Sequence, residues 1–187
     1  MRNNALKICL IAIFSAMLTG GKYALSAIPN VEIVSILIAV FSYVFGFIAL
    51  PATLIFCATE SLIYGFGLWL ISYFIYWPLL SLLFVLLGRI KAKWWVSVPT
   101  ICVSTIVFGA LTSLVDVGLF SGNFNSFWER FAIMYARGIV FFVVHILSNT
   151  AIFAVGFKPL TKLCGGIERK MFPQKNMIAE NNGKGNC

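Results

Sequence analysis

The chain has 187 residues, of which 60% are hydrophobic and only 11% are charged. Soluble proteins are about 45–50% apolar and about one quarter charged, so this composition excludes a soluble protein and indicates an integral membrane protein. We expect the formal net charge of +8 to lie against anionic lipid headgroups. No nucleic-acid partner is expected, because nucleic-acid binding would need a soluble basic surface.

The predicted elements are six hydrophobic segments, each bounded by polar or helix-breaking residues. In chain order they cover 5–28, 31–49, 51–67, 70–89, 95–119 and 128–157. Pro29 separates the first two segments, while Pro51 and Pro99 lie near helix starts. Pro78 is expected to kink the fourth segment, and Pro159 to end the last one. The expected fold is therefore all-α, an integral membrane bundle of six transmembrane helices.

Small residues recur every four positions in the first segment, at Ala12, Ala16, Gly20 and Ala24. This spacing places them on one face of a helix, where they let the backbone of another helix approach closely. Membrane helices associate through such faces because lipid provides no hydrophobic drive between them. We therefore expect Ala12, Ala16 and Gly20 to contact a partner subunit.

The second and third segments carry polar candidates for a binding site. Asn30 and Glu32 lie at the turn before the second helix, where they either cap that helix or close over a ligand. Glu60 stands nine residues after Pro51, about 14 Å along a helix, which places its carboxylate near the middle of the membrane. Tyr64 lies one turn further on the same face.

Aromatic residues follow in the fourth segment and at the start of the sixth. Trp69, Tyr73 and Trp128 are predicted to gather near the outer surface of the membrane. They are either part of an interfacial aromatic belt or stack on a flat ligand.

A polar stripe is predicted in the sixth segment, where Arg137 and His145 lie on one helix face. Arg137 either pairs with Glu60 or Asp116 inside the protein or meets an anionic group of a ligand. For His145, a hydrogen bond to a backbone carbonyl in the core competes with ligand contact. Both questions stay open at the level of the sequence.

The basic residues predict the orientation of the bundle. With a cytoplasmic N-terminus, all of the 14 basic residues except Lys22, Arg130 and Arg137 lie in cytoplasmic segments. The positive-inside rule favours this arrangement, which places both termini in the cytoplasm. The six helices then occupy 1–163, and 164–187 form a polar cytoplasmic tail that we expect to be disordered.

Motifs for catalysis and for cofactors are missing from the sequence. It contains one histidine, no metal-ligand spacing, no nucleotide-binding loop and no nucleophile elbow. We expect neither an enzyme nor a bound cofactor or metal, and the chain has no ATPase motif of its own.

An ordered set of features resembles the substrate-binding S component of energy-coupling factor (ECF) vitamin transporters. The similarity covers residues 5–163 and comprises the six segments, Ala12-x-x-x-Ala16, the IPNVE turn at 28–32, Phe45-Gly46 and the KPL sequence at 158–160.

The resemblance implies a multi-pass protein of a prokaryotic cell membrane whose domain 1–163 captures a vitamin or related micronutrient from outside. Ala12 and Ala16 would dock on a membrane scaffold, the T component, which two cytoplasmic ATPases drive. The loop around Asn30 would help to gate the pocket. The resemblance identifies no particular vitamin.

Two other functions compete with this interpretation. An ion-coupled secondary transporter would use Glu60 or Asp116 as a proton or sodium relay. A membrane enzyme or assembly scaffold would bind no soluble ligand tightly.

Overall fold

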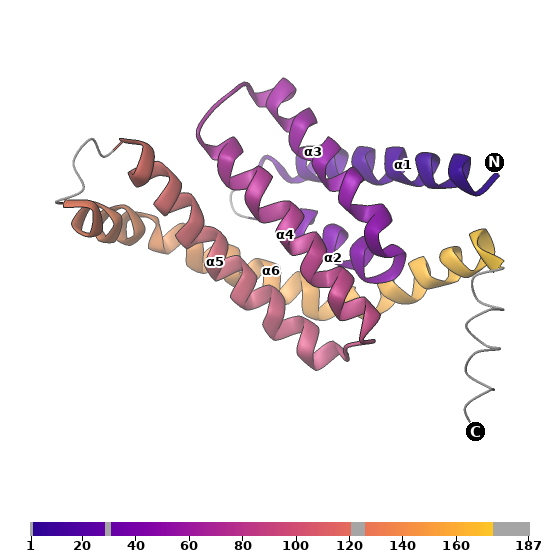
Figure 1. The fold of residues 1–187 in the computed structure, drawn as a ribbon. Coiled ribbons are helices and arrows are strands. Elements are labelled where there is room, and N and C mark those ends of the chain that lie inside the picture. Colours follow the sequence, from indigo (N-terminus) through magenta and orange to yellow (C-terminus); the bar gives the residue numbers. More distant parts are fainter. Residues whose placement is uncertain (1, 29–30, 121–125, 174–187) are drawn as a thin grey trace.

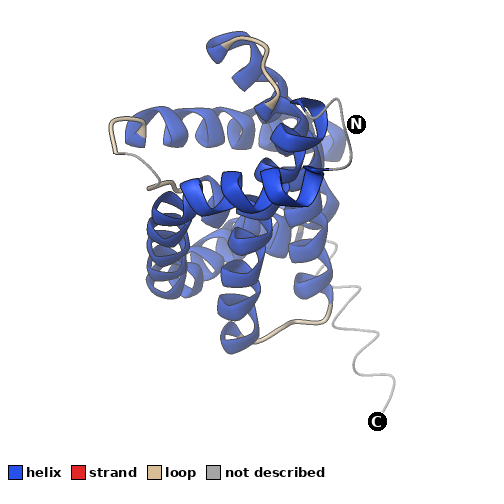
Figure 2. Cartoon of the chain, turned by 90° about the vertical axis from the view of Figure 1, so that its left-hand side faces the viewer, coloured by secondary structure: helices blue, strands red, loops and turns tan. Residues whose placement is uncertain are grey.

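The computed structural model describes residues 2–28, 31–120 and 126–173, and all regular structure among them is helical (Figure 1, Figure 2). The elements are α1 (Arg2–Leu25), α2 (Val34–Phe45), the 3-10 turn η1 (Gly46–Ile48), α3 (Ala49–Tyr64), α4 (Trp69–Arg89), α5 (Trp94–Phe120) and α6 (Phe127–Met171). The expected all-α class is thus confirmed, and the six predicted segments correspond in order to the six α-helices.

Within the described residues, five helical stretches are long and apolar enough to cross a membrane: 4–25, 34–64, 69–89, 94–119 and 127–171. The protein is therefore a multi-pass membrane protein. The stretch 34–64 contains both α2 and α3, and α2 by itself has 12 residues, about 18 Å. A hydrocarbon core is about 30 Å thick, so six complete crossings and the side of each terminus stay predictions.

Helix α2 ends at Phe45 because the next residue, Gly46, has a φ of 64°. This left-handed backbone is readily adopted by glycine and breaks the hydrogen-bonding ladder between α2 and η1. The Gly46 amide donates to the carbonyl of Ser42, and α3 follows directly after η1. Helix α2 is therefore shorter than the predicted segment 31–49, and the Phe45-Gly46 pair noted in the family resemblance lies at its end.

Helix α2 lies at the centre of the bundle, where nearly all its side chains are buried against α4 and α6. Phe41 of α2 stacks on Phe14 of α1, with ring centroids 3.8 Å apart. The hydroxyls of Ser42 and Ser81 hydrogen-bond at 2.8 Å and join α2 to α4. In addition, α1 packs against α3, α5 lies along α6, and α4 packs against both α3 and α5.

Helix α6 continues through Pro159 to Met171, so the expected helix end at this proline was wrong. Proline removes a single backbone donor, and the residues on both sides keep helical geometry. Residues 164–171, expected in the polar tail, therefore belong to α6, whereas 174–187 lie outside the described residues. Pro51 lies in the first turn of α3 as expected.

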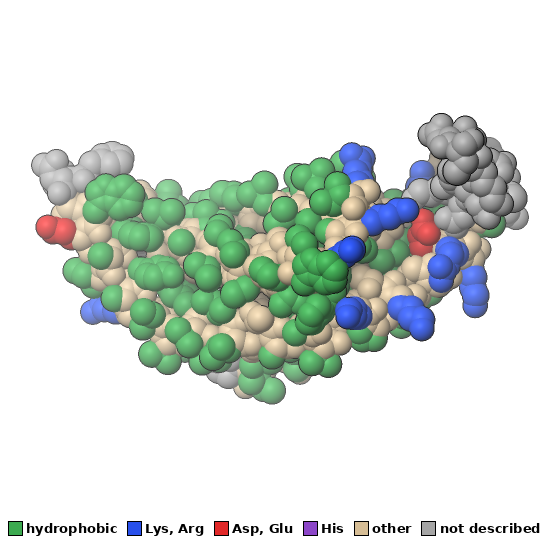
Figure 3. Space-filling model, turned by 90° about the horizontal axis from the view of Figure 1, so that it is seen from below, with side chains coloured by type: hydrophobic (Ala, Val, Ile, Leu, Met, Phe, Trp, Pro, Cys, Tyr) green, Lys and Arg blue, Asp and Glu red, His purple; other side chains and the backbone are tan. Residues whose placement is uncertain are grey.

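The charge pattern of two helices indicates where the membrane lies. Residues 138–157 of α6 and 69–88 of α4 contain no Asp, Glu, Lys or Arg. At 1.5 Å per residue each stretch is about 30 Å long, which matches a hydrocarbon core. Lys and Arg side chains gather at one end of the molecule (Figure 3), where α4 ends and the last part of α6 lies. We refer to this as the basic end.

Candidate functional site

A cavity of about 410 Å³, which we call the chamber, opens between five helices in the half of the bundle away from the basic end. Its walls come from the end of α1, the turn before α2, the end of α3, the start of α4 and the middles of α5 and α6. The lining residues are Lys22, Leu25, Ser26, Ile28, Val31, Glu32, Tyr64, Tyr73, Phe108 and His145. His145 indicates how deep the chamber lies in the membrane. It is about 10 Å along α6 from residue 138, where the uncharged stretch 138–157 begins.

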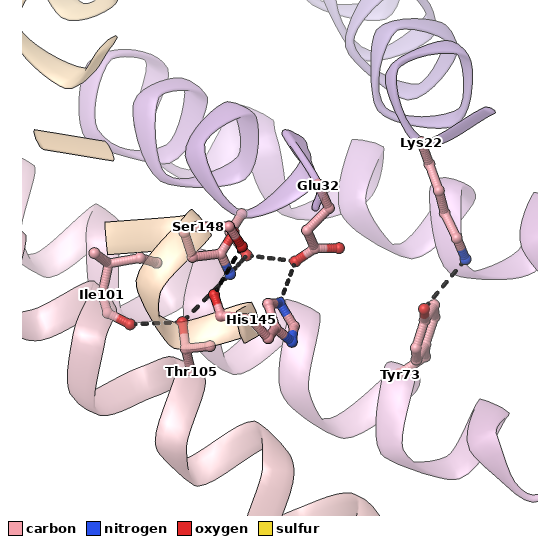
Figure 4. Close-up of polar contacts among 9 residues, drawn as sticks. Lys22, Glu32, Tyr73, Ile101, Thr105, His145 and Ser148 are labelled. Atoms are coloured by element: carbon pink, nitrogen blue, oxygen red, sulfur yellow. Dashed lines mark hydrogen bonds and ion pairs between the residues drawn. The ribbon is translucent and has the colours of Figure 1, made fainter. Parts of the chain in front are cut away.

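Lys22 is the centre of one polar cluster in the chamber. Its ammonium forms an ion pair with the carboxylate of Glu60. Figure 4 shows its other contact, with the hydroxyl of Tyr73 at 3.1 Å. The rings of Tyr64, Trp69 and Tyr73 surround the same nitrogen, with centroids 5.0, 5.7 and 4.6 Å away. Cation–π attraction and the ion pair together hold the lysine at this wall.

Glu60 lies behind Lys22 and does not line the chamber. Its side chain is 1% exposed, against 21% for Lys22, so the ion pair is largely withdrawn from solvent. One carboxylate oxygen meets Lys22, while the other, Oε1, is buried without a hydrogen-bond partner among the described residues. A charge at this depth is stable only with a partner, and Lys22 is that partner.

Glu32 and His145 form a second polar cluster on the opposite wall (Figure 4). His145 Nε2 lies 3.1 Å from Glu32 Oε1, and the hydroxyl of Ser35 donates to the same oxygen at 2.8 Å. The Asn149 amide donates to Ser35 at 3.2 Å and to Thr105 at 3.4 Å. This network ties the turn before α2 to α5 and α6.

The network changes the titration of the Glu32 carboxyl. Burial alone would raise its pKa, but the hydrogen bond and charge of His145, with further hydrogen bonding from Ser35 and Asn149, lower the pKa below its ordinary value of 4.5. Glu32 is therefore held as a carboxylate at neutral pH.

Aromatic rings form the floor between the two polar clusters. The Phe108 ring meets the edge of His145 at 5.7 Å and lies 6.2 Å from the Tyr73 ring. Trp77 packs behind them against Tyr73 at 5.6 Å and is fully buried. Lys22 and Glu32 each already have a side-chain partner, so the cavity offers aromatic surface together with polar groups that are engaged within the protein.

The structure brings six of the ten predicted site residues to this region. Glu32, Tyr64, Tyr73 and His145 line the chamber, and Glu60 and Trp69 contact it through Lys22.

The other predicted residues lie elsewhere or cannot be placed. Trp128 and Arg137 are exposed on α6, and Asp116 is half-buried on α5, but none of them lines the chamber. Among the described residues no ion pair joins Arg137 to Glu60 or Asp116, since Glu60 pairs with Lys22. Asn30 lies outside the described residues.

Sequence reasoning missed Lys22 and Phe108. The signal for Lys22 was present, because a lysine inside an apolar helix is costly unless a partner receives it. Phe108 carried no signal, since a phenylalanine in an apolar segment is ordinary.

The small-residue stripe of α1 lies on the outside of the bundle. Ala12, Ala16, Gly20 and Ala24 are all exposed, and a Cβ at Gly20 would meet nothing within 4 Å. The opposite side of α1 is buried through Leu10, Phe14 and Leu18. The stripe is therefore a smooth outer surface of the chain.

Comparisons with protein families, curated proteins and solved structures find no match to this chain. Its function has to be inferred from its own residues. Among the residues that the structure describes, no group of three or more His, Cys, Asp or Glu side chains is arranged to hold a metal ion.

Proposed function

We propose that this protein is a substrate-specific membrane subunit that captures a small vitamin-like molecule in the chamber, on the outer side of a prokaryotic cell membrane. Uptake would be driven by ATP through partner subunits, a membrane scaffold and two cytoplasmic ATPases. The sequence resemblance to ECF S components motivates this proposal.

The observation that carries the proposal is the chamber itself. Its volume of about 410 Å³ falls within the range of about 300–1,000 Å³ that is typical of small-molecule sites. Such sites combine aromatic walls with a few fixed polar groups, and here Lys22 and the Glu32–His145 pair are fixed on opposite walls with Phe108 between them. Because the charges are already paired, a ligand with a ring and hydrogen-bonding groups fits this cavity better than a simple ion.

The location of the chamber agrees with capture from outside. It lies away from the basic end, which the positive-inside rule assigns to the cytoplasm. The exposed stripe at Ala12, Ala16 and Gly20 is available for a membrane partner, and the sequence lacks a nucleotide-binding loop, as expected for a subunit whose motor is a separate protein.

Mass spectrometry of the purified protein provides the direct test. We expect a small molecule to co-purify in stoichiometric amount and to be lost from a Phe108→Trp variant, whose larger ring fills the chamber. Val155→Trp is the matched control, because Val155 is 81% exposed on α6 and lies outside the chamber. No bound molecule after growth in several rich media would contradict capture.

Ion-coupled transport is a second candidate, favoured by the buried Glu60 oxygen that lacks a hydrogen-bond partner among the described residues. A carboxylate of this kind suits a proton or sodium relay. Uptake by the reconstituted chain alone, driven by a proton or sodium gradient, would establish this function in place of ATP-driven uptake. Dependence on added ATPases would exclude it.

A further inference from the structure

A second cavity, which we call the basic cavity, opens at the basic end of the protein. Its volume is about 540 Å³, and it lies between the end of α2, the turn joining α4 to α5, and the last part of α6. The walls bring together the basic side chains Lys91, Lys158, Lys162 and Arg169 with one carboxylate, that of Glu168. The cavity therefore has an excess of positive charge.

Two helices independently place this cavity at the level of lipid headgroups. Lys158 directly follows the uncharged stretch 138–157 of α6, and Lys91 lies just after the uncharged stretch 69–88 of α4. Lys158 also lies 4.7 Å from the ring of Trp94, and tryptophan beside lysine is typical of a membrane interface.

The backbone at Lys91 indicates that a lysine is specifically placed at the cavity. Helix α4 ends in a Schellman motif, in which the Ala92 amide donates to Leu87 at 2.8 Å and the Lys91 amide to Gly88 at 3.1 Å. Lys91 has a left-handed backbone, with φ of 50°. Glycine is the usual residue at this position of a Schellman motif. Lysine is accepted here despite its Cβ, and its side chain lines the cavity.

The neutral polar groups of the wall are already engaged within the protein. The Tyr43 hydroxyl donates to the Ala92 carbonyl at 2.8 Å, and the Thr161 hydroxyl donates to Phe157 at 2.8 Å. Among the described residues, by contrast, no carboxylate forms an ion pair with Lys91, Lys158 or Lys162. These three ammonium groups are therefore available to an anion.

We propose that the basic cavity binds a phosphoryl group, supplied by the headgroup of an anionic phospholipid in the leaflet at the basic end. Several lysines around one phosphate act as convergent point charges, and the cytoplasmic leaflet of a cell membrane exposes anionic phospholipid headgroups at this level. The proposal concerns lipid binding alone and does not depend on the function proposed for the chamber.

The test compares the full chain in nanodiscs of phosphatidylcholine with and without one fifth phosphatidylglycerol, with bound lipid measured by native mass spectrometry. We expect preferential retention of phosphatidylglycerol, reduced about fivefold by Lys91→Gln or by Lys162→Gln, the change expected for the loss of one lysine near the surface. Lys93→Gln is the matched control, because Lys93 lies in the same turn, carries the same charge and does not line the cavity.

Each outcome bears on the proposal. Loss in Lys91→Gln and Lys162→Gln with retention in Lys93→Gln supports a built site. Equal losses in all three variants would overturn it, because diffuse surface charge would then explain the binding. The absence of any preference for phosphatidylglycerol would overturn it as well, because the cavity would then not select an anionic headgroup. A further arm adds millimolar inorganic phosphate in phosphatidylcholine alone. Stabilisation of the wild type that Lys91→Gln abolishes, combined with no preference for phosphatidylglycerol, would keep the phosphoryl site but overturn the lipid as its source.

Discussion

The ammonium of Lys22 on α1 and the carboxylate of Glu60 on α3 form an ion pair at the wall of the chamber, although they are 38 residues apart in the chain. Glu60 is buried and Lys22 is the member that lines the cavity. Glu60 thus fixes the position of the ammonium group that lines the chamber.

Replacing Lys22 by methionine is expected to destabilise the protein by about 3 kcal/mol, because it leaves the buried Glu60 charge without a partner. The double variant Lys22→Met/Glu60→Gln should lose less than Lys22→Met alone, since it removes the uncompensated charge as well. Denaturant unfolding of the detergent-solubilised protein measures both. Lys7→Met on the exposed part of α1 is the matched control and should be neutral. A loss of stability in the double variant equal to the sum of the losses in Lys22→Met and Glu60→Gln would show that the two groups are not coupled.

The pH dependence of stability should report the Glu32 carboxyl. Its pKa is lowered in the folded protein, so its stabilising effect is fully present above pH 4.5 and is lost as the pH falls through the lower folded value. Glu32→Gln should therefore be less stable than the wild type at pH 7, and the difference should shrink below pH 4.5. Thermal unfolding between pH 7 and 3 measures this difference. A difference that stays constant over this range would contradict the ionised state of Glu32.

If the stripe docks on a partner subunit as proposed, tryptophan at Ala16 should block that assembly without disturbing the fold. Ala16 is exposed, so the larger side chain meets no atom of the bundle core, but it separates the stripe from an approaching helix. We expect unchanged thermal stability and ligand retention, with loss of co-purifying scaffold and ATPase subunits from native membranes. Val155→Trp on α6 should assemble normally. Normal assembly of Ala16→Trp would assign the stripe to lipid contact alone.

Lys91 should tolerate glycine better than valine. Its left-handed backbone suits glycine, so Lys91→Gly should change the unfolding free energy by less than about 1 kcal/mol. Lys91→Val places a β-branched side chain in the same conformation and should cost about 1–2 kcal/mol more. Denaturant titration compares the two variants directly. Equal stabilities would indicate that the backbone relaxes at this turn.

The helices could be predicted because their signals are local. Apolar runs and the flanking turns produced six segments in the right order. The ends of the helices were harder to predict than their order. Hydropathy does not show that α2 ends after 12 residues or that α6 continues through Pro159. One missing backbone donor does not outweigh the helical preference of the residues around it.

The site could be predicted only in part, because its pairings depend on packing between distant helices. Glu60 was chosen because a carboxylate inside an apolar segment is costly, but its partner could not be predicted, since nothing local indicates that α1 packs on α3. Glu32 and His145 were chosen separately, and their contact joins residues 113 positions apart. Arg137 shares the periodicity of His145, yet lies beyond the stretch 138–157 and is exposed.

Helix α6 contributes His145 to the chamber and Lys158 to the basic cavity, 13 residues or about 20 Å apart on one rod. If α6 couples binding in the chamber to binding in the basic cavity, thermodynamic linkage requires each binding event to change the affinity of the other by the same factor. Whatever factor a headgroup applied to the affinity for the captured molecule, that molecule would apply to the affinity for the headgroup. Lipid composition in one leaflet would then change binding in the chamber, and a molecule in the chamber would change lipid binding, both through helix α6.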